Sequence, residues 1–180
     1  MERETVRHQV AIAGHVRMQF TRQPVAGAVV QASGLPGNRT AQTSSAADGH
    51  FYFLDLPDGE YTLHVSLPGA GTRYGTVEKR IKVSSSLGAH QIRHIKMSPV
   101  DIELPTTCLS GTVRAQNYAI VPMAEVRLEG SGEHTFSGAD GRYCLTAFEM
   151  PQDPEAKRTI GVYVRGERRL SRNVVHPHFM

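Results

Sequence analysis

The stretch over residues 47–69, ADGHFYFLDLPDGEYTLHVSLPG, constrains the fold more than any other part of the chain. Asp48 and Gly49 predict a two-residue hairpin turn, because glycine accepts a positive φ and an aspartate side chain can bond the nearby backbone. In the strand that follows, Phe51 and Phe53 point to the same side, since successive strand side chains alternate between two faces. One face of this strand is therefore expected to be buried.

A second turn and a second strand complete the stretch. Pro57 and Gly59 interrupt the first strand, and from Tyr61 to Leu67 every second residue is apolar while the residues between are polar. This alternation is typical of a strand with one buried and one solvated face. The pattern predicts an antiparallel β-sandwich, in which we assign structural turn positions to Asp48, Gly49, Pro57, Gly59, Tyr61, Asp140 and Gly141.

The rest of the first half fits the same fold class. Short runs with period-two alternation predict seven strands there, at about 10–20, 25–34, 40–45, 51–55, 61–67, 77–83 and 90–97. The strands at 40–45 and 51–55 are expected to pair through Asp48-Gly49, and 68–75 is interpreted as a flexible loop. The 17 glycines and 10 prolines suit short strands joined by many turns, and no long apolar stripe recurs at helical spacing.

Several features indicate the compartment. No apolar run approaches the roughly 20 residues that a membrane helix needs, and the start MERETVRHQ is charged where a signal peptide would be apolar. We therefore expect a cytoplasmic protein that does not bind a membrane. Cys108 and Cys144 both neighbour core-phase residues, so both are expected to point outward. Free thiols are expected in a cytoplasmic protein, although the two could form one disulfide.

The charge of the chain is unevenly distributed. The net charge of +3 is too small to indicate nucleic-acid binding, but 101–155 has a net charge of −6 and 156–180 of +5. The basic segment is interpreted first as a solvated face or a strand lying along its own acidic domain. The alternative is a docking surface for an acidic protein, with nucleic acid and membrane last. Its candidate partner-binding residues are Arg165, Arg168, Arg169, Arg172, His176, His178 and Phe179.

The second half of the chain repeats motifs of the first in the same order. An AGHV motif in the first strand recurs as SGTV, a PVA turn as PMA, and ADGHF as ADGRY. Three ordered matches at similar spacing indicate an internal duplication. The paired segments are 12–16 with 109–113, 24–26 with 122–124, and 47–51 with 139–143.

These motifs together resemble the carboxypeptidase regulatory-like domains, a branch of the transthyretin-like sandwiches. The family pattern is a Gly-x-Val strand, a Pro-x-x-x-Val turn and strand, and then ADGxFxFxxLPxGxYxLxV, and the first half matches all of it. The resemblance implies an all-β chain of two tandem Ig-like or transthyretin-like antiparallel sandwiches. The expected plan is an N-terminal extension at 1–9, a first sandwich at 10–98, a linker at 99–107, a shorter sandwich at 108–175 and a tail at 176–180.

The second copy departs from the family pattern after its Asp-Gly turn. An insertion, QDPEAKR, stands where LPxGxYxL should follow, and only strands at about 159–164 and 168–175 remain. The second sandwich is thus expected to have six strands, one fewer than the first, with an open edge that must be solvated or covered. We hypothesise that the segment 100–104, or a strand from another chain, fills that edge.

Catalytic and ligand-binding patterns are weak. His90 and His94 are about 13 Å apart on one strand, and His176 with His178 lack a third ligand nearby, so no metal, cofactor or catalytic residue is predicted. The resemblance to the related hydroxyisourate hydrolases rests on His15 and the 24–27 turn. It fails at the closing tetrapeptide, for which 163–166 has one extra residue. Sugar binding would have to use Tyr52, Tyr74 and Tyr118, since the chain has no tryptophan.

We therefore expect a non-catalytic structural or adaptor subunit that docks through sandwich edges, loops and termini. As the resemblance implies, such domains occur as appended interaction modules and in bacterial multiprotein assemblies, and a phage-tail-like contractile injection particle is the most concrete candidate. The expected partners are proteins of a multi-subunit assembly, self-association stays open, and neither nucleic acid nor a membrane is expected. A carbohydrate or small-molecule binding module and the hydrolase are the alternatives.

Overall fold

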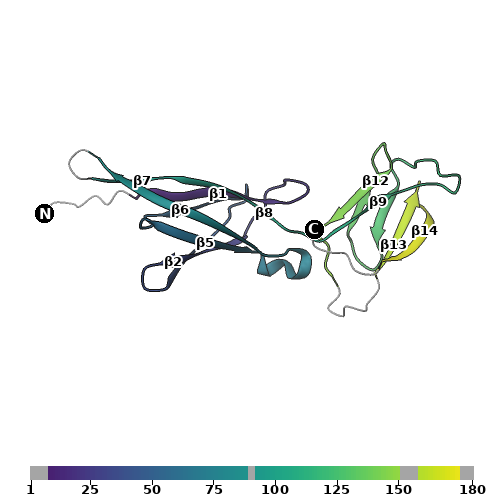
Figure 1. Cartoon of the computed structure of the whole chain (residues 1–180). Helices are drawn as coiled ribbons and strands as arrows, with labels where there is room; N and C mark the ends of the chain where they lie inside the picture. The colour runs from purple at the N-terminus through teal and green to yellow at the C-terminus, as the bar shows by residue number, and fades with distance from the viewer. Residues whose placement is uncertain (1–7, 89–91, 151–157, 175–180) are drawn as a thin grey trace. The chain divides into compact units, whose positions relative to one another are not determined.

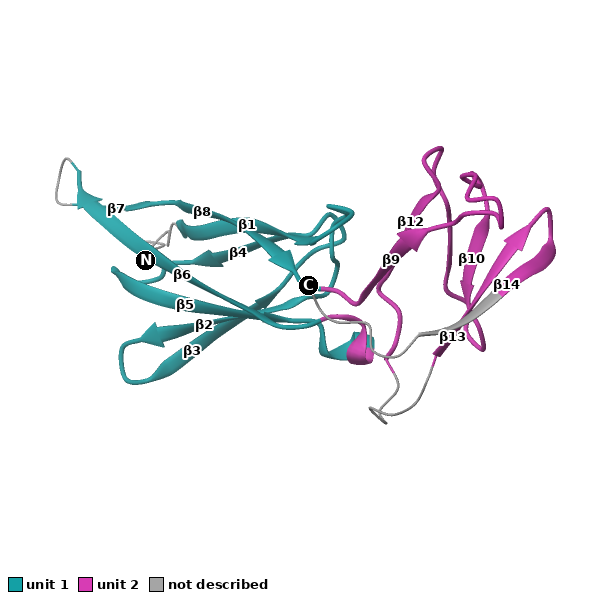
Figure 2. Ribbon diagram, turned by 45° about the vertical axis from the view of Figure 1, so that its right-hand side comes forward, with its two compact units in different colours: residues 1–70, 75–105 teal, residues 71–74, 106–180 magenta. Residues whose placement is uncertain are grey.

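The computed structural model describes residues 8–88, 92–150 and 158–174, in which there are fourteen strands and one 3-10 helix (Figure 1). The all-β prediction is confirmed. Most of the expected N-terminal extension, the tail at 176–180 and nearly all of the QDPEAKR insertion lie outside the described residues. The chain divides into two compact units (Figure 2). Unit 1 contains Met1–Ala70 and Gly75–Pro105, and unit 2 contains Gly71–Tyr74 and Thr106–Met180.

Unit 1 is a sandwich of a three-stranded and a five-stranded sheet. The smaller sheet has the order β4-β1-β8 and the larger one β3-β2-β5-β6-β7. The strands are β1 Val10–Met18, β2 Val29–Leu35, β3 Arg39–Ser44, β4 His50–Leu54, β5 Gly59–Ser66, β6 Val77–Leu87, β7 Arg93–Lys96 and β8 Ser98–Leu104. The alternating residues of the two sheets face each other, so that Phe51, Leu63 and Val65 are at most 1% exposed.

The Asp48-Gly49 turn does not close a hairpin, so the predicted pairing of its two flanking strands is wrong. β3 pairs with β2 in the larger sheet, whereas β4 pairs with β1 in the smaller one. The turn itself forms as expected: Gly49 has a φ of 80°, and the His50 N–H donates to Asp48 Oδ1 at 2.9 Å. The chain therefore crosses from one sheet to the other here, because local turn chemistry specifies a reversal but not the sheet that receives the next strand.

The next predicted turn also crosses between the sheets, and Tyr61 stabilises it. Tyr61 is 2% exposed, and its hydroxyl donates a 2.8 Å hydrogen bond to the carbonyl of Pro57. A buried hydroxyl needs such a partner. Further along, the expected flexible loop at 68–75 contains the 3-10 helix η1, Pro68–Arg73.

The predicted linker at 99–107 is largely wrong, because Ser98–Leu104 is strand β8 of unit 1. It runs parallel to β1, with Val100 opposite Gly14, so the sandwich is not wholly antiparallel. Val100, Ile102 and Leu104 are at most 7% exposed. The sequence shows alternation in this segment, but the prolines at its ends favoured a linker. Proline is tolerated at strand ends and sheet edges, so these prolines are compatible with the observed edge strand. The hypothesis that 100–104 fills the edge of the second sandwich is therefore also wrong.

Unit 2 has the six predicted strands in its described part. They are β9 Cys108–Thr112, β10 Glu125–Leu128, β11 His134–Phe136, β12 Arg142–Thr146, β13 Arg158–Val164 and β14 Glu167–Val174, in sheets of order β11-β10-β13-β14 and β12-β9. The order of the strands matches β1 to β6 of unit 1. Its core includes Val126, Leu128 and Phe148, each at most 1% exposed. Counterparts of β7 and β8 are absent from the described residues of this unit.

A buried serine recurs at equivalent places in the two units. Ser45 Oγ accepts from the Ala28 N–H at 2.9 Å and donates to the Val25 carbonyl at 2.6 Å. Ser137 Oγ in the same way accepts from the Ala124 N–H at 2.9 Å and donates to the Val121 carbonyl at 2.8 Å. Each serine satisfies two backbone groups next to the core, which extends the repeat beyond its sequence motifs.

Candidate functional site

The residues of the predicted basic surface differ in whether they are described and in whether they pair with a carboxylate. Arg165 is exposed in the β13–β14 turn, with a φ of 52°. Arg168 pairs with Glu129 at 3.3 Å, and Arg169 pairs with Glu167 at 2.5 Å. The backbone of Arg172 lies in β14 opposite Ile160, while His176, His178 and Phe179 lie outside the described residues. Two of the arginines thus have carboxylate partners within unit 2, and the role of this surface stays a prediction.

Two histidines and an aspartate form one lateral row across the smaller sheet of unit 1. His50, His15 and Asp101 are register partners on β4, β1 and β8. The two imidazole centroids are 5.1 Å apart, and His15 Nδ1 is 3.6 Å from Asp101 Oδ1. The row lies in an open groove of about 580 Å³. Among the described residues, no group of three histidine, cysteine or acidic side chains has the geometry to hold a metal ion.

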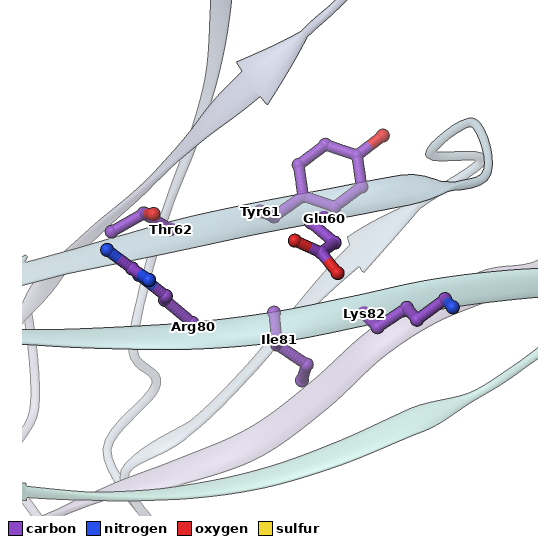
Figure 3. Close-up of a pocket in the computed structure, with 6 residues that line it drawn as sticks. All are labelled: Glu60, Tyr61, Thr62, Arg80, Ile81 and Lys82. Carbon is purple, nitrogen blue, oxygen red and sulfur yellow. The ribbon is translucent and has the colours of Figure 1, made fainter.

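The exposed face of β5 and β6 forms a second depression, with a volume of about 520 Å³ (Figure 3). Its lining comes from adjacent residues of the two strands, in which Glu60 is opposite Lys82 and Thr62 opposite Arg80. Because the lining is a flat row of cross-strand neighbours, it offers polar contacts to a partner surface rather than enclosure of a small molecule. The tyrosines considered for sugar binding do not gather: Tyr52 belongs to unit 1, and Tyr74 and Tyr118 to unit 2.

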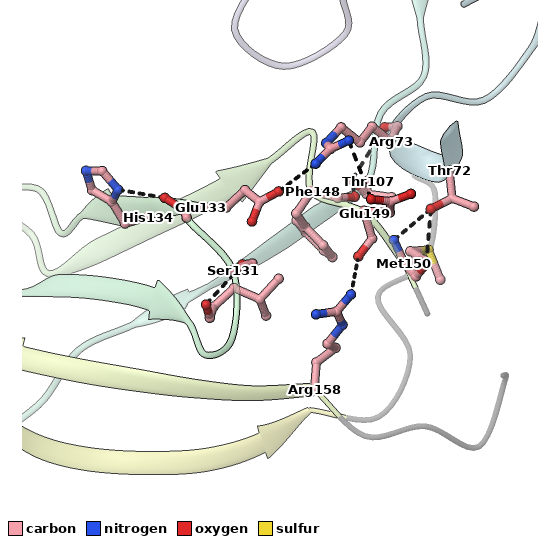
Figure 4. A network of polar contacts seen from close by, with 12 residues as sticks. Thr72, Arg73, Thr107, Ser131, Glu133, His134, Phe148, Glu149, Met150 and Arg158 are labelled. Atoms are coloured by element: carbon pink, nitrogen blue, oxygen red, sulfur yellow. Dashed lines mark hydrogen bonds and ion pairs between the residues drawn. The ribbon is translucent and has the colours of Figure 1, made fainter. Parts of the chain in front are cut away.

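Arg73 is the centre of a polar network inside unit 2 (Figure 4). Its guanidinium lies 3.0 Å from Glu133 Oε1 and 3.6 Å from Glu149 Oε2. Its carbonyl accepts from the Thr107 N–H at 3.0 Å and from the Thr106 hydroxyl at 3.0 Å. The neighbouring Thr72 hydroxyl accepts from the Met150 N–H at 2.7 Å. These contacts attach the four residues Gly71–Tyr74 to a unit that is otherwise formed by 106–180.

Acid is expected to weaken this network through Glu133. The Ser131 hydroxyl, and then Arg73, hold the pKa of Glu133 below its usual value of 4.5. A depressed carboxyl pKa stabilises the fold above the unfolded value and ceases to do so as the pH falls through the folded value. We expect Glu133→Gln to destabilise unit 2 by less than about 1 kcal/mol above pH 4.5, with a difference from wild type that shrinks below it.

Hydrogen exchange in the strands of unit 2 between neutral pH and pH 3 measures this effect. Glu60→Gln, at an exposed position in unit 1, is the matched control and should leave exchange in unit 2 unchanged. A Glu133→Gln difference that stays constant throughout the acid range would contradict the assignment.

The two cysteines lie next to each other in unit 2, and only one of the two that were predicted to point outward is exposed. Cys144 is exposed, but Cys108 is 6% exposed, and their Sγ atoms are 3.1 Å apart. They lie on one face of the β9–β12 pair, since Cys108 is opposite Thr146 and Cys144 opposite Ser110. Alternation reveals the face on which a side chain lies but not whether that face is covered. Burial, followed by the hydrogen bond to Cys144, raises the pKa of Cys108 to about 12.

We expect oxidised glutathione to convert this pair into an internal disulfide. The exposed Cys144 thiolate attacks one glutathione sulfur and releases one glutathione thiolate. Cys108 then loses its proton and attacks Cys144 Sγ, releasing the second. The net reaction reduces one oxidised glutathione to two thiols. Because the pKa of Cys108 is about 12, the second step should accelerate as the pH rises above neutrality.

Intact-mass measurement follows both steps: the mixed disulfide adds one glutathione, and the final product has lost two hydrogen atoms relative to the reduced chain. Cys108→Ser should stop at the mixed disulfide on Cys144. Accumulation of a doubly glutathionylated chain would contradict the expected closure.

Strand β9 has an unpaired side. Among the described strands it pairs with β12 alone, whereas its counterpart β1 lies between β4 and β8. Within the described part of unit 2, β14 likewise pairs only with β13. Strand edges of this kind present N–H and C=O groups to a partner backbone. The sequence predicted an open edge in this unit but did not place it at β9, because that placement depends on β8 having no counterpart among the described residues here.

Comparison with known proteins supports the family resemblance in unit 1. The model of the carboxypeptidase regulatory-like domain matches residues 11–88. The predicted second copy lies outside that match and stays a prediction as a family member. No curated protein matches the chain. In the described part of the chain, no helix is long and apolar enough to cross a membrane.

Solved structures with similar folds include three bacterial proteins. A Streptococcal ancillary pilin is 14% identical, with 93% of this chain and 58% of that chain covered and a TM-score of 0.40. The Bacillus anthracis TIE protein is 15% identical, with 86% and 28% covered and a TM-score of 0.43. The shaft pilin SpaA of Lactobacillus rhamnosus GG is 10% identical, with 97% and 95% covered and a TM-score of 0.39. The chain thus spans less than two thirds of the length of the first two, about 58% and 28% respectively.

Proposed function

We propose that this protein is a non-catalytic structural or adaptor subunit that docks through sheet edges and loops in a larger protein assembly. The observation that supports this proposal most is that β9 and β14 each pair on one side only among the described strands of unit 2, whereas β1 and β6 of unit 1 are paired on both sides. A sandwich provides a rigid frame, and its edges and loops are held at defined positions for a partner.

The proposed assembly is a bacterial, phage-tail-like contractile injection particle. The support for this choice is the family resemblance of residues 11–88, which implies use in bacterial multiprotein assemblies. Within such a particle, the exposed Arg165 and Arg169 would contact an acidic protein surface, and the ion pair of Arg169 with Glu167 would be exchanged for one with the partner.

Native purification of the complete protein from the cells that produce it tests the proposal. We expect the protein to migrate with a particle many times the 19.8 kDa of this chain, and to dissociate from it at raised salt if basic side chains contribute. Migration as a free monomer would overturn the assembly function.

Charge reversal at Arg165 and Arg169 tests the basic surface separately. The double variant is expected to lose association with the particle, because like charges at a rim oppose encounter. Charge reversal at Arg39, an exposed arginine of unit 1, is the matched control and should retain association. Retention by both variants would remove the arginines from the docking surface while leaving the assembly function in place.

A further inference from the structure

Unit 1 shows how an added parallel strand completes this kind of sandwich. β8 lies along β1 with Val100 opposite Gly14, and it buries Val100, Ile102 and Leu104. The approach is close, since a Cβ built on Gly14 would lie 1.6 Å from the carbonyl oxygen of Val100. Glycine at this position leaves space for the incoming backbone.

The equivalent edge in unit 2 has the same residue pattern and no strand from the described residues. Leu109, Gly111 and Val113 of unit 2 repeat the positions of Ile12, Gly14 and Val16. Ile12 and Gly14 are buried, whereas Leu109 and Gly111 are only half-buried. An open groove of about 320 Å³ lies on the adjoining β9–β12 pair, lined by Ser110, Gly111, Thr112, Arg142 and Tyr143. The residue pattern of the edge is therefore retained in unit 2, where none of the described strands covers it.

The glycine at this edge has no backbone neighbour of the kind found in unit 1. A Cβ built on Gly111 would meet the Tyr143 ring, with its hydroxyl at 2.8 Å, and no backbone atom is among its three nearest contacts. Glycine within a strand costs about 0.5–1 kcal/mol relative to alanine. The occurrence of glycine at residue 111, which is equivalent to Gly14, is explained if a second backbone approaches β9 as β8 approaches β1.

Backbone donors on this edge can be assigned from the ladder. The Val113 N–H donates to the Gly141 carbonyl at 2.8 Å, on the side of β12. Because successive N–H groups of a strand point to opposite sides, those of Ser110 and Thr112 point away from β12. Both residues are exposed.

The charges around the edge define the chemistry of its occupant. In unit 1, Asp101 of β8 is opposite His15, and Glu103 is opposite Arg17 and also pairs with Arg22. In unit 2, the position of Arg17 is held by Arg114. Arg142 on β12 is 81% exposed, and its Nε lies 3.6 Å from the exposed Asp140 carboxylate, an ion pair that an incoming acidic side chain would share or replace. An incoming strand with acidic side chains on its outer face would match these two arginines.

We propose that the β9 edge of unit 2 binds an extended segment of another protein. The segment runs parallel to β9 and adds a seventh strand to the six described strands of the unit. The segment alternates apolar side chains, directed at the core, with acidic side chains directed at Arg114 and Arg142. Its residue opposite Gly111 places a backbone carbonyl where Gly111 lacks a side chain. The inference rests on the proposed assembly function and specifies the edge and the partner chemistry that this function would use.

A synthetic peptide with the sequence MSPVDIELP, taken from residues 97–105, has this alternation and serves as the probe. It is added to the complete protein while amide hydrogen exchange is followed residue by residue. We expect exchange at Ser110 and Thr112 to slow at least tenfold at saturating peptide, with little change at Gly111, whose N–H points to β12. A peptide of the same composition with the alternation scrambled is the control. No added protection, or equal protection by both peptides, would overturn the proposal.

Two substitutions at one site separate edge binding from folding. Ser110→Pro removes an N–H from the free edge, where proline is tolerated, and should abolish the protection of Thr112 by the peptide. Ser110→Ala keeps the N–H and should retain it. If Ser110→Pro is unfolded by circular dichroism, Thr112→Pro replaces it, with protection then read at Ser110. Protection that persists in a folded proline variant would place the peptide elsewhere.

Native particles distinguish this inference from the proposed function. If the purified particle contains the protein and Ser110 and Thr112 are protected in it, both stand. If the particle contains the protein but these two amides exchange as fast as in the free chain, the β9 edge is not the contact and only the assembly function stands. If the free chain already protects both amides as strongly as Gly111, the edge is not open and the inference is wrong whatever the particle shows.

Discussion

Gly14→Ala is expected to destabilise unit 1 by about 3 kcal/mol or more and to release β8 from β1. The added Cβ would lie 1.6 Å from the Val100 oxygen and 2.7 Å from its carbonyl carbon, so the clash is with backbone and no side-chain rotation can relieve it. Outside such a contact, the same substitution in a strand would be neutral or stabilising. Chemical denaturation gives the loss of stability, and hydrogen exchange over 98–104 reports the release of β8.

Gly111→Ala is the matched control, at the repeated position of unit 2. Its Cβ meets the end of the Tyr143 side chain, which can move, and the expected loss is below about 1 kcal/mol. If the β9 edge binds a strand, this variant should fold normally and bind the MSPVDIELP peptide less tightly. Equal destabilisation by the two substitutions would show that the β8 contact does not determine the requirement for Gly14.

Ser45→Ala and Ser137→Ala are each expected to destabilise their own unit by about 2 to 4 kcal/mol. Each substitution deletes one acceptor and one donor, and leaves a backbone N–H and a carbonyl next to the core without that partner. A buried polar group deprived of its hydrogen bond costs about 1–3 kcal/mol. Thermal and chemical denaturation measure the loss, and hydrogen exchange in the strands of each unit assigns it.

Ser44→Ala is the control for this pair, since Ser44 is the exposed neighbour of Ser45. Its effect should lie within about 0.5 kcal/mol of zero. Unit 2 should keep its stability in Ser45→Ala, and unit 1 in Ser137→Ala. A loss below about 1 kcal/mol in both serine variants would mean that water replaces the hydroxyl in each unit.

Much of the fold could be predicted because the relevant signals are local. Period-two alternation placed strands near all of β1 to β7, and the repeat predicted the six strands of unit 2. Asp48 and Gly49 form the expected turn. The prediction that the flanking strands pair as a hairpin was wrong, however, because the same turn can connect strands in two different sheets as well as neighbours in one sheet.

The candidate site was less accessible to sequence reasoning. The exposed arginines of β14 and its preceding turn were identified by charge, but their carboxylate partners, such as Glu129, come from distant strands. The edge at β9 can be recognised only after the structure places Ser98–Leu104 beside β1, because the described residues of unit 2 contain no counterpart of that strand. One signal in the sequence pointed to it: Gly111 repeats Gly14.

The sequence by itself determined the all-β class, the recurrence of three short motifs, and the positions of the Asp-Gly turns, since alternation and turn chemistry act over a few residues. Only the tertiary structure decided which strands are neighbours, that β8 completes the first sandwich in parallel, and that Cys108 lies beside Cys144. Strand pairing joins residues far apart in the chain, and its energy comes from cross-strand contacts and shared burial that no local pattern encodes.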